Sequence, residues 1–232
     1  MQDSDKGSGG VAASLKPGRR YSTPKRDQRA AATRATILAA AETMFLRDGY
    51  VGTSMKAIAA QAGVSEKTMY LTFTSKATLL RQIIHRAVRG DETPTPLAER
   101  WEWRALVAGR PEEILTRFAA LNATLMTRTA AVIALGESAA STDPELAQYR
   151  DQAHAETRTN LRALAAELKT RGVLAPDISE QDAADTIYAL ATDESVYLRL
   201  TRDCGWTSAR YADLIARTHN ATLTHGRPAE QT

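Results

Sequence analysis

Cysteine is almost absent from this chain, since Cys204 is the only one among 232 residues. One cysteine can form no internal disulfide and lacks a second thiolate for a zinc pair, so we expect it to act as a small apolar residue, at least half-buried. No apolar run approaches the roughly 20 residues that a membrane-spanning helix needs. The first ten residues also lack the apolar segment of a secretory signal. We therefore expect a protein of the cytoplasm.

Catalytic motifs are missing as well. The sequence has no Gly-x-Ser-x-Gly, no glycine-rich phosphate loop and no His-x-x-x-His, and its four histidines are scattered: His85, His154, His219 and His225. We expect no catalytic residue, no metal and no cofactor, and the protein is not predicted to be an enzyme.

Charge is unevenly distributed, although the net charge is only +3. Residues 1–90 hold 15 Lys and Arg against 6 Asp and Glu, whereas residues 91–232 hold 15 against 21. A local basic excess is typical of phosphate binding, and an acidic remainder keeps the rest of a protein away from a polyanion. The amino-terminal third is therefore the candidate for nucleic-acid binding.

Residues 1–29 contain almost no large apolar side chain, and we expect a disordered basic arm there. Such an arm can reach a minor groove or follow phosphates. For its first half a solubilising tail is an equally good interpretation. The arm carries the basic residues Lys16, Arg19, Arg20, Lys25, Arg26 and Arg29, and the sequence leaves open whether it contacts DNA.

Residues 30–90 show four helical patterns in close succession. The first helix is expected from about Thr33 to Gly49, the second after Thr53-Ser54, the third from Ser65 and the fourth after Ser75. Between the second and third, Ala59 is small enough for two helices to approach, and Gly63 can take the positive φ of a tight turn. This is a helix-turn-helix at about residues 54–73, whose second helix can enter a DNA major groove.

The rest of the chain is predicted to be a second domain, residues 91–225, followed by a disordered tail at 226–232. Two prolines in the stretch 90–96 break the helix and mark the boundary. Helical spacing then predicts helices at about 111–138, 143–170, 179–202 and 208–224. The fold class is therefore all-α: a helix-turn-helix domain, a connecting helix and a larger helical domain.

The stretch from Thr33 to Ile84 resembles the amino-terminal domain of the TetR family of bacterial transcriptional regulators. The resemblance rests on Ala62-Gly63-Val64-Ser65, on Thr68-Met69-Tyr70 with Phe73, and on Ser75-Lys76 with Leu79-Leu80. Residues 189–211 are similar to one group of TetR ligand-binding and dimerisation domains. The resemblance implies a homodimeric regulator, most often a repressor, that binds a near-palindromic DNA operator.

The family positions that bind phosphates correspond here to Thr53, Ser54, Thr68, Tyr70 and Lys76. Hydroxyls and helix-start amides donate to phosphate oxygens, and a lysine adds charge. Base contacts are expected from Ser65, Glu66, Lys67, Leu71 and Thr72, because these side chains can donate to, accept from or press on base edges. Phe73 is expected in the core.

Two positions depart from the family pattern. The place of Lys67 is often a small residue in the family, and that of Leu71 is often histidine or tyrosine. The family's operator sequences therefore cannot be transferred to this chain.

The resemblance also implies a small-molecule effector that changes the spacing of the two recognition helices. Residues that could line its pocket are Trp101, Trp103, Phe118, Leu121, Leu125, Met126, Tyr149, His154 and Tyr188, although ordinary core packing explains each of them as well. The dimer interface is expected from the last two helices, with candidates Ile187, Leu190, Ala191, Val196, Leu198, Tyr211, Leu214 and Ile215; each could equally belong to the core of one subunit.

Two other functions remain open at this point. One is an architectural DNA-binding protein with little sequence preference, which would use mainly the basic arm. The other, less favoured, is a small-molecule-binding helical protein or an enzyme. Neither requires a well-formed recognition helix.

Overall fold

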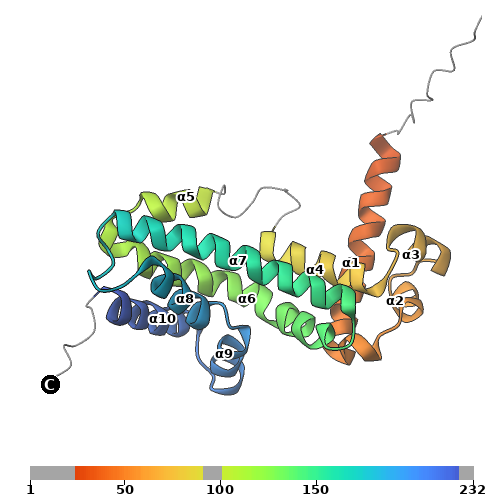
Figure 1. Ribbon diagram of the computed structural model, residues 1–232. Helices are drawn as coiled ribbons and strands as arrows, with labels where there is room; N and C mark the ends of the chain where they lie inside the picture. The colour runs from red at the N-terminus through yellow and green to blue at the C-terminus, as the bar shows by residue number, and fades with distance from the viewer. Residues whose placement is uncertain (1–23, 91–100, 225–232) are drawn as a thin grey trace, which may run out of the picture.

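The computed structural model describes residues 24–90 and 101–224, and all regular structure within them is helical (Figure 1). The expected all-α fold class is confirmed. The helices are α1 (Pro24–Gly52), α2 (Met55–Gln61), α3 (Glu66–Thr72), α4 (Lys76–Arg89), α5 (Trp101–Ala108), α6 (Ile114–Ala140), α7 (Pro144–Thr170), α8 (Glu180–Ala191), α9 (Glu194–Leu198) and α10 (Ser208–Leu223). A 3-10 turn, Pro111–Glu113, precedes α6, and a π-helical turn, Arg199–Asp203, follows α9.

Helix α1 begins nine residues earlier than the sequence pattern predicts. It starts at Pro24, so residues 24–29 of the expected disordered arm are helical, and that part of the prediction is wrong. Proline suits a first helical turn, Asp27 lies in that turn, and three alanines at 30–32 continue it. At the other end the helix is interrupted at Gly49, with φ 75°, where the sequence places its end.

The amino-terminal helices share one apolar core. Its fully buried side chains include Ile37 and Phe45 of α1, Ile58 of α2, Met69 of α3 and Leu80 of α4. Residues of α6 and α7, among them Val132 and Leu146, belong to the same core. The helix-turn-helix is therefore fixed directly against the long helices of the second part.

Helix α6 is the centre of the larger helical part, in contact with α1, α4, α5, α7, α9 and α10. A second core lies around it, with Leu115, Leu164, Ile187 and Tyr211 among its buried side chains. Residues 111–140 are long and apolar enough to span a membrane by length and composition alone. A helix at the centre of a bundle needs the same composition, and the position of α6 explains it.

Three details of the second part differ from the sequence-based expectation. The helix predicted for 179–202 breaks after Ala191, because the Asp193 carboxylate accepts hydrogen bonds from the amides of Ser195 and Val196 and starts α9 instead. Helix α5 was not predicted. Cys204, expected to be at least half-buried, is exposed. The predicted boundary at 91–96, the arm over 1–23 and the tail after Thr224 lie outside the described residues.

Candidate nucleic-acid interface

Three serines begin the helices of the helix-turn-helix region. The Ser54 hydroxyl accepts a hydrogen bond from the Ala57 amide at 3.1 Å, Ser65 does so from Thr68 at 3.1 Å, and Ser75 from Thr78 at 2.9 Å. Each serine satisfies an amide that the helix itself leaves without a partner. The starts of α2, α3 and α4 are therefore fixed by local chemistry.

The turn between α2 and α3 has the geometry that the sequence predicts. Gly63 has a φ of +66°, and its amide donates to the Ala60 carbonyl at 3.1 Å. The next amide, that of Val64, donates to the carbonyl of the buried Ala59 at 3.0 Å. This pair of bonds is the Schellman end of a helix, and it fixes the angle at which α3 leaves.

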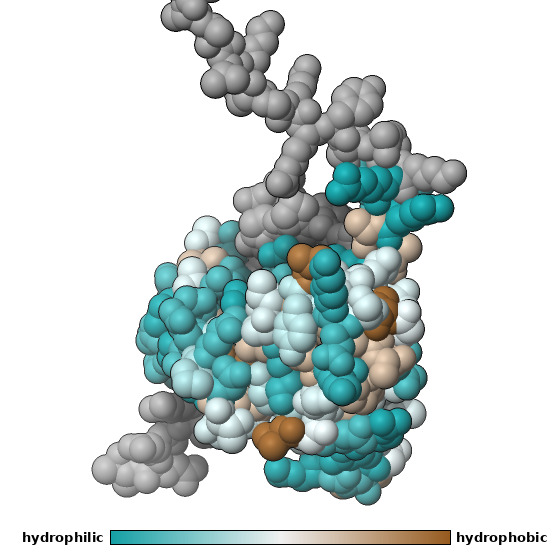
Figure 2. All heavy atoms as spheres, turned by 90° about the vertical axis from the view of Figure 1, so that its right-hand side faces the viewer, coloured by the Kyte–Doolittle hydropathy of each residue, from teal (hydrophilic) through white to brown (hydrophobic). Residues whose placement is uncertain are grey.

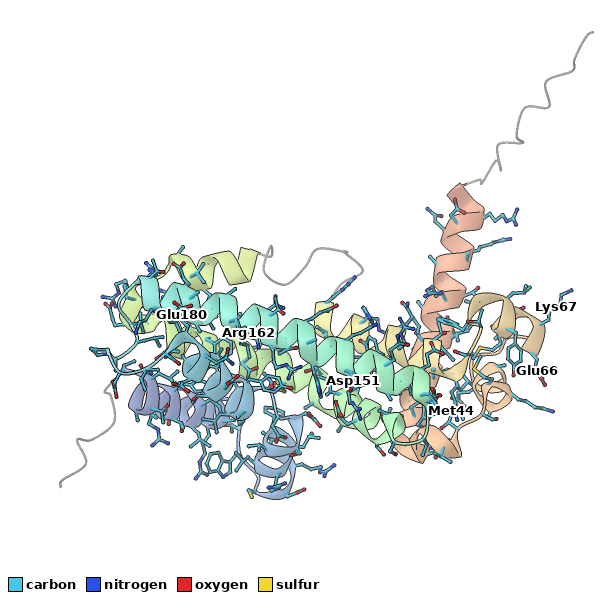
Figure 3. The ribbon with its side chains drawn as sticks, in the orientation of Figure 1. Met44, Glu66, Lys67, Asp151, Arg162 and Glu180 are labelled. Carbon is cyan, nitrogen blue, oxygen red and sulfur yellow. The ribbon has the colours of Figure 1, made fainter. Side chains whose placement is uncertain are left out.

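Helix α3 has one buried and one exposed face. Met69 is fully buried, and Phe73, which directly follows the helix, is also in the core, as predicted. On the other side lie Glu66, Lys67, Tyr70 and Leu71, all exposed. Figure 3 shows Glu66 and Lys67 at the outer edge of the molecule, away from the body. We call these four residues the α3 face.

Large apolar side chains are exposed mainly at this end of the molecule. In the described parts of the chain the markedly exposed ones are Leu71 at 79%, Val51 at 75%, Tyr70 at 53% and Leu46 at 48%, all from α1 and α3. Figure 2 views this end and shows separate hydrophobic spots within a mostly hydrophilic surface. Helix α3 thus presents an acid, a base, a phenol and an aliphatic group together.

The hydroxyls around α3 are partly engaged within the helix. The Ser65 and Thr68 hydroxyls are 2.9 Å apart, and the Thr72 hydroxyl donates to the Thr68 carbonyl at 2.8 Å. Thr68 and Thr72 are half-buried, whereas Ser54 and Ser65 are exposed. Lys56 of α2 approaches Glu66 at 3.7 Å, a solvent-exposed ion pair of little energetic weight.

Two of the predicted phosphate-binding residues point into the protein instead. The Thr53 side chain is buried, and its hydroxyl donates to the Gly49 carbonyl at 2.8 Å. The Lys76 ammonium donates to the carbonyls of Tyr50 at 2.7 Å and Thr53 at 3.1 Å, and lies 4.2 Å from the centre of the Tyr50 ring. Desolvation lowers the pKa of Lys76, and the negative charge of Asp143 partly offsets this decrease. Both side chains hold the α1–α2 connection together.

Two contacts at this end of the molecule are not predicted by any pattern in the sequence. The Arg34 guanidinium lies 4.4 Å from the centre of the Phe73 ring and donates to the Thr72 carbonyl at 3.5 Å, so it covers the end of α3. The Tyr50 hydroxyl donates to the Asp143 carboxylate at 2.6 Å. Both pairs are far apart in sequence, and only the tertiary fold brings them together.

The described residues predicted to line an effector pocket divide between the two cores: Tyr149 packs against the amino-terminal core, and Tyr188 packs against the core around α6. Phe118 and Met126 are buried in the core around α6, and Leu121 and Leu125 of α6 are half-buried. Tyr149 packs on His85 at a ring distance of 5.4 Å, beside the amino-terminal core. His154 of α7 contacts Glu137 at 3.0 Å and the Tyr188 ring at 6.4 Å. Trp101 and Trp103 lie in α5, and their side chains are outside the described part.

A surface hollow of about 540 Å³ lies between the start of α6 and helix α10. Thr116 lines it from α6, and the other lining residues come from α10: Asp213, Ala216, Arg217, Asn220 and Ala221. None of the seven predicted pocket residues whose side chains the structure describes lines this hollow. Within the described residues, no group of three or more His, Cys, Asp and Glu side chains is placed to hold a metal ion.

The comparisons with known proteins agree with this arrangement. Residues 37–83 match the family model of bacterial regulatory proteins, tetR family. No curated protein sequence matches the chain significantly.

Solved structures share its fold over most of its length. One is native NalD of Pseudomonas aeruginosa, the secondary repressor of the MexAB-OprM multidrug efflux pump, at 22% identity and a TM-score of 0.64 over 85% of this chain and all of that one. A putative TetR-family regulator from Mesorhizobium loti has 22% identity and a TM-score of 0.62, over 84% of this chain and 98% of that one.

A third is a putative transcriptional regulator from Saccharomonospora viridis in complex with choline, with 18% identity and a TM-score of 0.62 over 84% of this chain and all of that one. The TM-scores establish the shared fold, and the family match covers the helix-turn-helix. Residues 37–83 therefore form an amino-terminal domain of the kind found in the tetR family of bacterial regulatory proteins, and the chain shares the fold of solved regulators.

Proposed function

We propose that the protein is a sequence-specific, DNA-binding transcriptional repressor, active as a homodimer and released from its operator by a small molecule. Residues 30–90 would bind DNA, and residues 91–225 would bind the effector and the second subunit. In this proposal α3 lies in the major groove while α2 crosses the phosphate backbone.

The observation that carries the proposal is the α3 face. The seven-residue helix α3 exposes two large apolar side chains, Tyr70 and Leu71, to solvent. While exposed, they add little stabilisation through burial of apolar surface. In a major groove Leu71 can press on a thymine methyl, Lys67 can donate to guanine and Glu66 can accept from cytosine. The Tyr70 hydroxyl and the amide-rich start of the helix can reach phosphates.

The proposed set of DNA contacts changes in one respect when the structure is considered. Ser54, Ser65 and the α3 face are accessible, and Thr68 and Thr72 are half-buried at its edge. Thr53 and Lys76 are engaged with backbone carbonyls. We therefore assign these two a positioning role and leave phosphate binding to the other hydroxyls and amides.

A dimer would use the outer sides of α8, α9 and α10. Of the eight candidate interface residues, Ile187, Ala191, Tyr211 and Ile215 lie in the core of the protomer. The half-buried ones, Leu190, Val196, Leu198 and Leu214, remain the candidates. Pairing of two such surfaces gives the two-fold symmetry that an inverted-repeat operator requires.

Effector control is supported by the kind of proteins that share the fold. One is a repressor of a multidrug efflux pump, and another was crystallised with choline. The larger helical part of this chain would bind the effector, and α4 and α6, which are in contact, would transmit the change to α3.

Binding-site selection tests the proposal. The purified protein is mixed with a random duplex library at about 0.15 M salt, and the retained DNA is sequenced. Enrichment of an inverted repeat with two equivalent half-sites is expected. Retention of DNA without enrichment would indicate an architectural binder, and no retention would remove the DNA-binding function.

A further inference from the structure

The first turns of α1 stand clear of the rest of the protein. Every residue from Arg26 to Ala32 is exposed, and the first buried side chain of the helix is Ile37. Figure 1 shows this part of α1 projecting past the other helices on the side of the molecule that carries α3. We call residues 24–33 the α1 extension.

Residues 26–32 of the α1 extension are not buried against any part of the chain that the structure describes. The extension has no face of large apolar side chains, since residues 30–32 are alanines and the exposed side chains of residues 26–29 are polar or charged. A short exposed helix is marginal in water by itself, and this one is continuous with the packed part of α1. Because residues 26–32 are exposed, the extension is a candidate contact surface for a partner outside the protomer.

The side of the extension that adjoins α3 is basic. Ile37, Ala41 and Met44 form the stripe of α1 that packs on the amino-terminal core, and steps of three and four residues continue that stripe to Arg34, Ala30 and Arg26. Arg29 is three residues from Arg26 and lies beside it on the helix surface.

Arg34 fixes the position of this stripe relative to the recognition helix. Its guanidinium lies over the Phe73 ring and donates to the Thr72 carbonyl, at the carboxyl end of α3. From Arg34 to Arg26 the helix rises by about 12 Å. Arg26 and Arg29 therefore extend the surface of the α3 face in one direction, beyond the end of α3.

We propose that the α1 extension binds the phosphates of DNA immediately outside the half-site that α3 reads, through Arg26 and Arg29. This rests on the proposed function. A span of about 12 Å corresponds to about three to four base pairs of duplex, so the contacts fall on flanking DNA. Guanidinium groups suit this role because they donate bidentate hydrogen bonds to phosphate oxygens.

The double variant Arg26→Gln, Arg29→Gln tests this proposal on the operator found by selection. Glutamine keeps the helix propensity and removes two charges. The matched control is Arg158→Gln, Arg162→Gln, which removes two exposed charges from α7. Figure 3 shows Arg162 on the part of α7 that lies away from α3. Affinity is measured against salt concentration on duplexes that end at the half-sites and on duplexes with about six further base pairs on each side.

On the long duplex we expect the extension variant to bind roughly tenfold more weakly than the wild type, with the salt slope reduced by about 0.9 for each phosphate that the protein no longer neutralises. On the short duplex the two proteins should bind alike, and the ranking of operator sequences should not change. The control should match the wild type on both. Circular dichroism verifies that both variants keep their helix content.

Three results would overturn the proposal. Equal affinity and slope of wild type and extension variant on the long duplex would show that the extension does not bind DNA. A changed sequence preference at the flanking base pairs would show base reading rather than phosphate binding. If the wild type selects no operator at all, the proposed function fails together with this inference, whereas the first two results leave it intact.

Discussion

At the scale of single residues, Lys76 shows how a side chain that looks like a ligand contact can be a structural one. Its ammonium joins the carbonyls of Tyr50 and Thr53, in the segment between the interruption of α1 at Gly49 and the start of α2. The amino-terminal end of α4 is thereby tied to the α1–α2 connection. Hydrogen bonds that involve a charged group stabilise a fold by about 1.5–3 kcal/mol.

Replacement Lys76→Met should therefore lower the free energy of unfolding by about 2 kcal/mol, as measured by urea denaturation. The salt slope of operator binding should stay unchanged, although the sequence alone predicts a decrease of about one for a phosphate-binding lysine. Lys56→Met is the control for stability, because in the described part of the chain its exposed ammonium pairs with Glu66 on the surface. A reduced slope at unchanged stability would restore Lys76 as a phosphate contact.

The sequence could not separate Thr53 from the accessible hydroxyls of the same motif. Thr53, Ser54 and Ser65 all stand at or before helix starts and have similar chemistry. Thr53 alone is buried, because the carbonyl of Gly49 lies within reach of its hydroxyl after the chain has turned. Such a partner depends on tertiary structure, whereas the caps by Ser54 and Ser75, and the helix start at Ser65, depend on local sequence, which predicts them.

A second residue-scale feature is His219, fully buried on α10 beside the ring of Phe118 at 6.1 Å. Neither ring nitrogen has a hydrogen-bond partner in the described part of the chain. Burial lowers the pKa of His219 from 6.5 to about 4. The ring is therefore neutral in the folded protein under conditions in which an unfolded chain already binds a proton.

The sign of the pH dependence follows from this difference. Between pH 6.5 and about 4 the unfolded state binds more protons, so stability rises with pH and is lost as the pH falls. In the wild type this effect lowers the free energy of unfolding by about 3 kcal/mol as the pH falls across that window, and His219→Phe should remove this loss. Urea denaturation of both proteins at several pH values measures it, and parallel stability curves would contradict the assignment.

At the scale of elements, the turn between α2 and α3 depends on one backbone conformation. Gly63 has a φ of +66°, and a Cβ built there would meet no other atom within 4 Å. The requirement for glycine is therefore conformational rather than steric. An alanine in the left-handed region costs about 1–2 kcal/mol, whereas asparagine adopts that region more readily.

Gly63→Ala should lower the free energy of unfolding by about 1 kcal/mol or more, and Gly63→Asn by less, in urea denaturation. Operator affinity should follow the same order, because the turn sets the direction of α3. If alanine is tolerated better than asparagine, the conformational explanation is wrong.

Element prediction succeeded where local signals agreed and failed where a cap competed with periodicity. The starts of α2, α3, α4 and α7 follow from Ser54, Ser65, Ser75 and Asp143, each of which caps its helix in the structure. The apolar spacing over 179–202 predicts one continuous helix, whereas in the structure a separate helix, α9, begins after Asp193. The early start of α1 was missed because an exposed helix has no apolar periodicity to detect.

At the scale of the whole molecule, Asp143 links the two parts of the protein. One carboxylate oxygen accepts the amides of Glu145 and Leu146 and begins α7, and the other accepts the Tyr50 hydroxyl at the end of α1. The same carboxylate raises the pKa of the Tyr50 phenol, after the larger effect of desolvation. A shift of α7 would therefore act on the base of the helix-turn-helix.

A double-mutant cycle of Tyr50→Phe and Asp143→Asn measures this link. We expect a coupling free energy of about 1–2 kcal/mol in urea denaturation, because the pair is a partly buried hydrogen bond to a carboxylate. The exposed pair Arg81–Glu145, at 3.0 Å, is the control and should give less than about 0.5 kcal/mol. Equal coupling free energies in the two cycles would contradict the claim that the Tyr50–Asp143 pair specifically links the two parts of the protein.

The function proposed for the whole molecule depends on the exposed face of α3 reading DNA sequence. Parallel binding-site selection with the wild type and with Lys67→Ala examines this step, with Arg162→Ala as the control for removal of a charge. We expect an inverted repeat for the wild type and the control, and a changed preference at the same position of both half-sites for Lys67→Ala. Identical enriched sequences for the wild type and Lys67→Ala would refute the assignment of Lys67, and the absence of enrichment for the wild type would refute sequence reading by α3 itself.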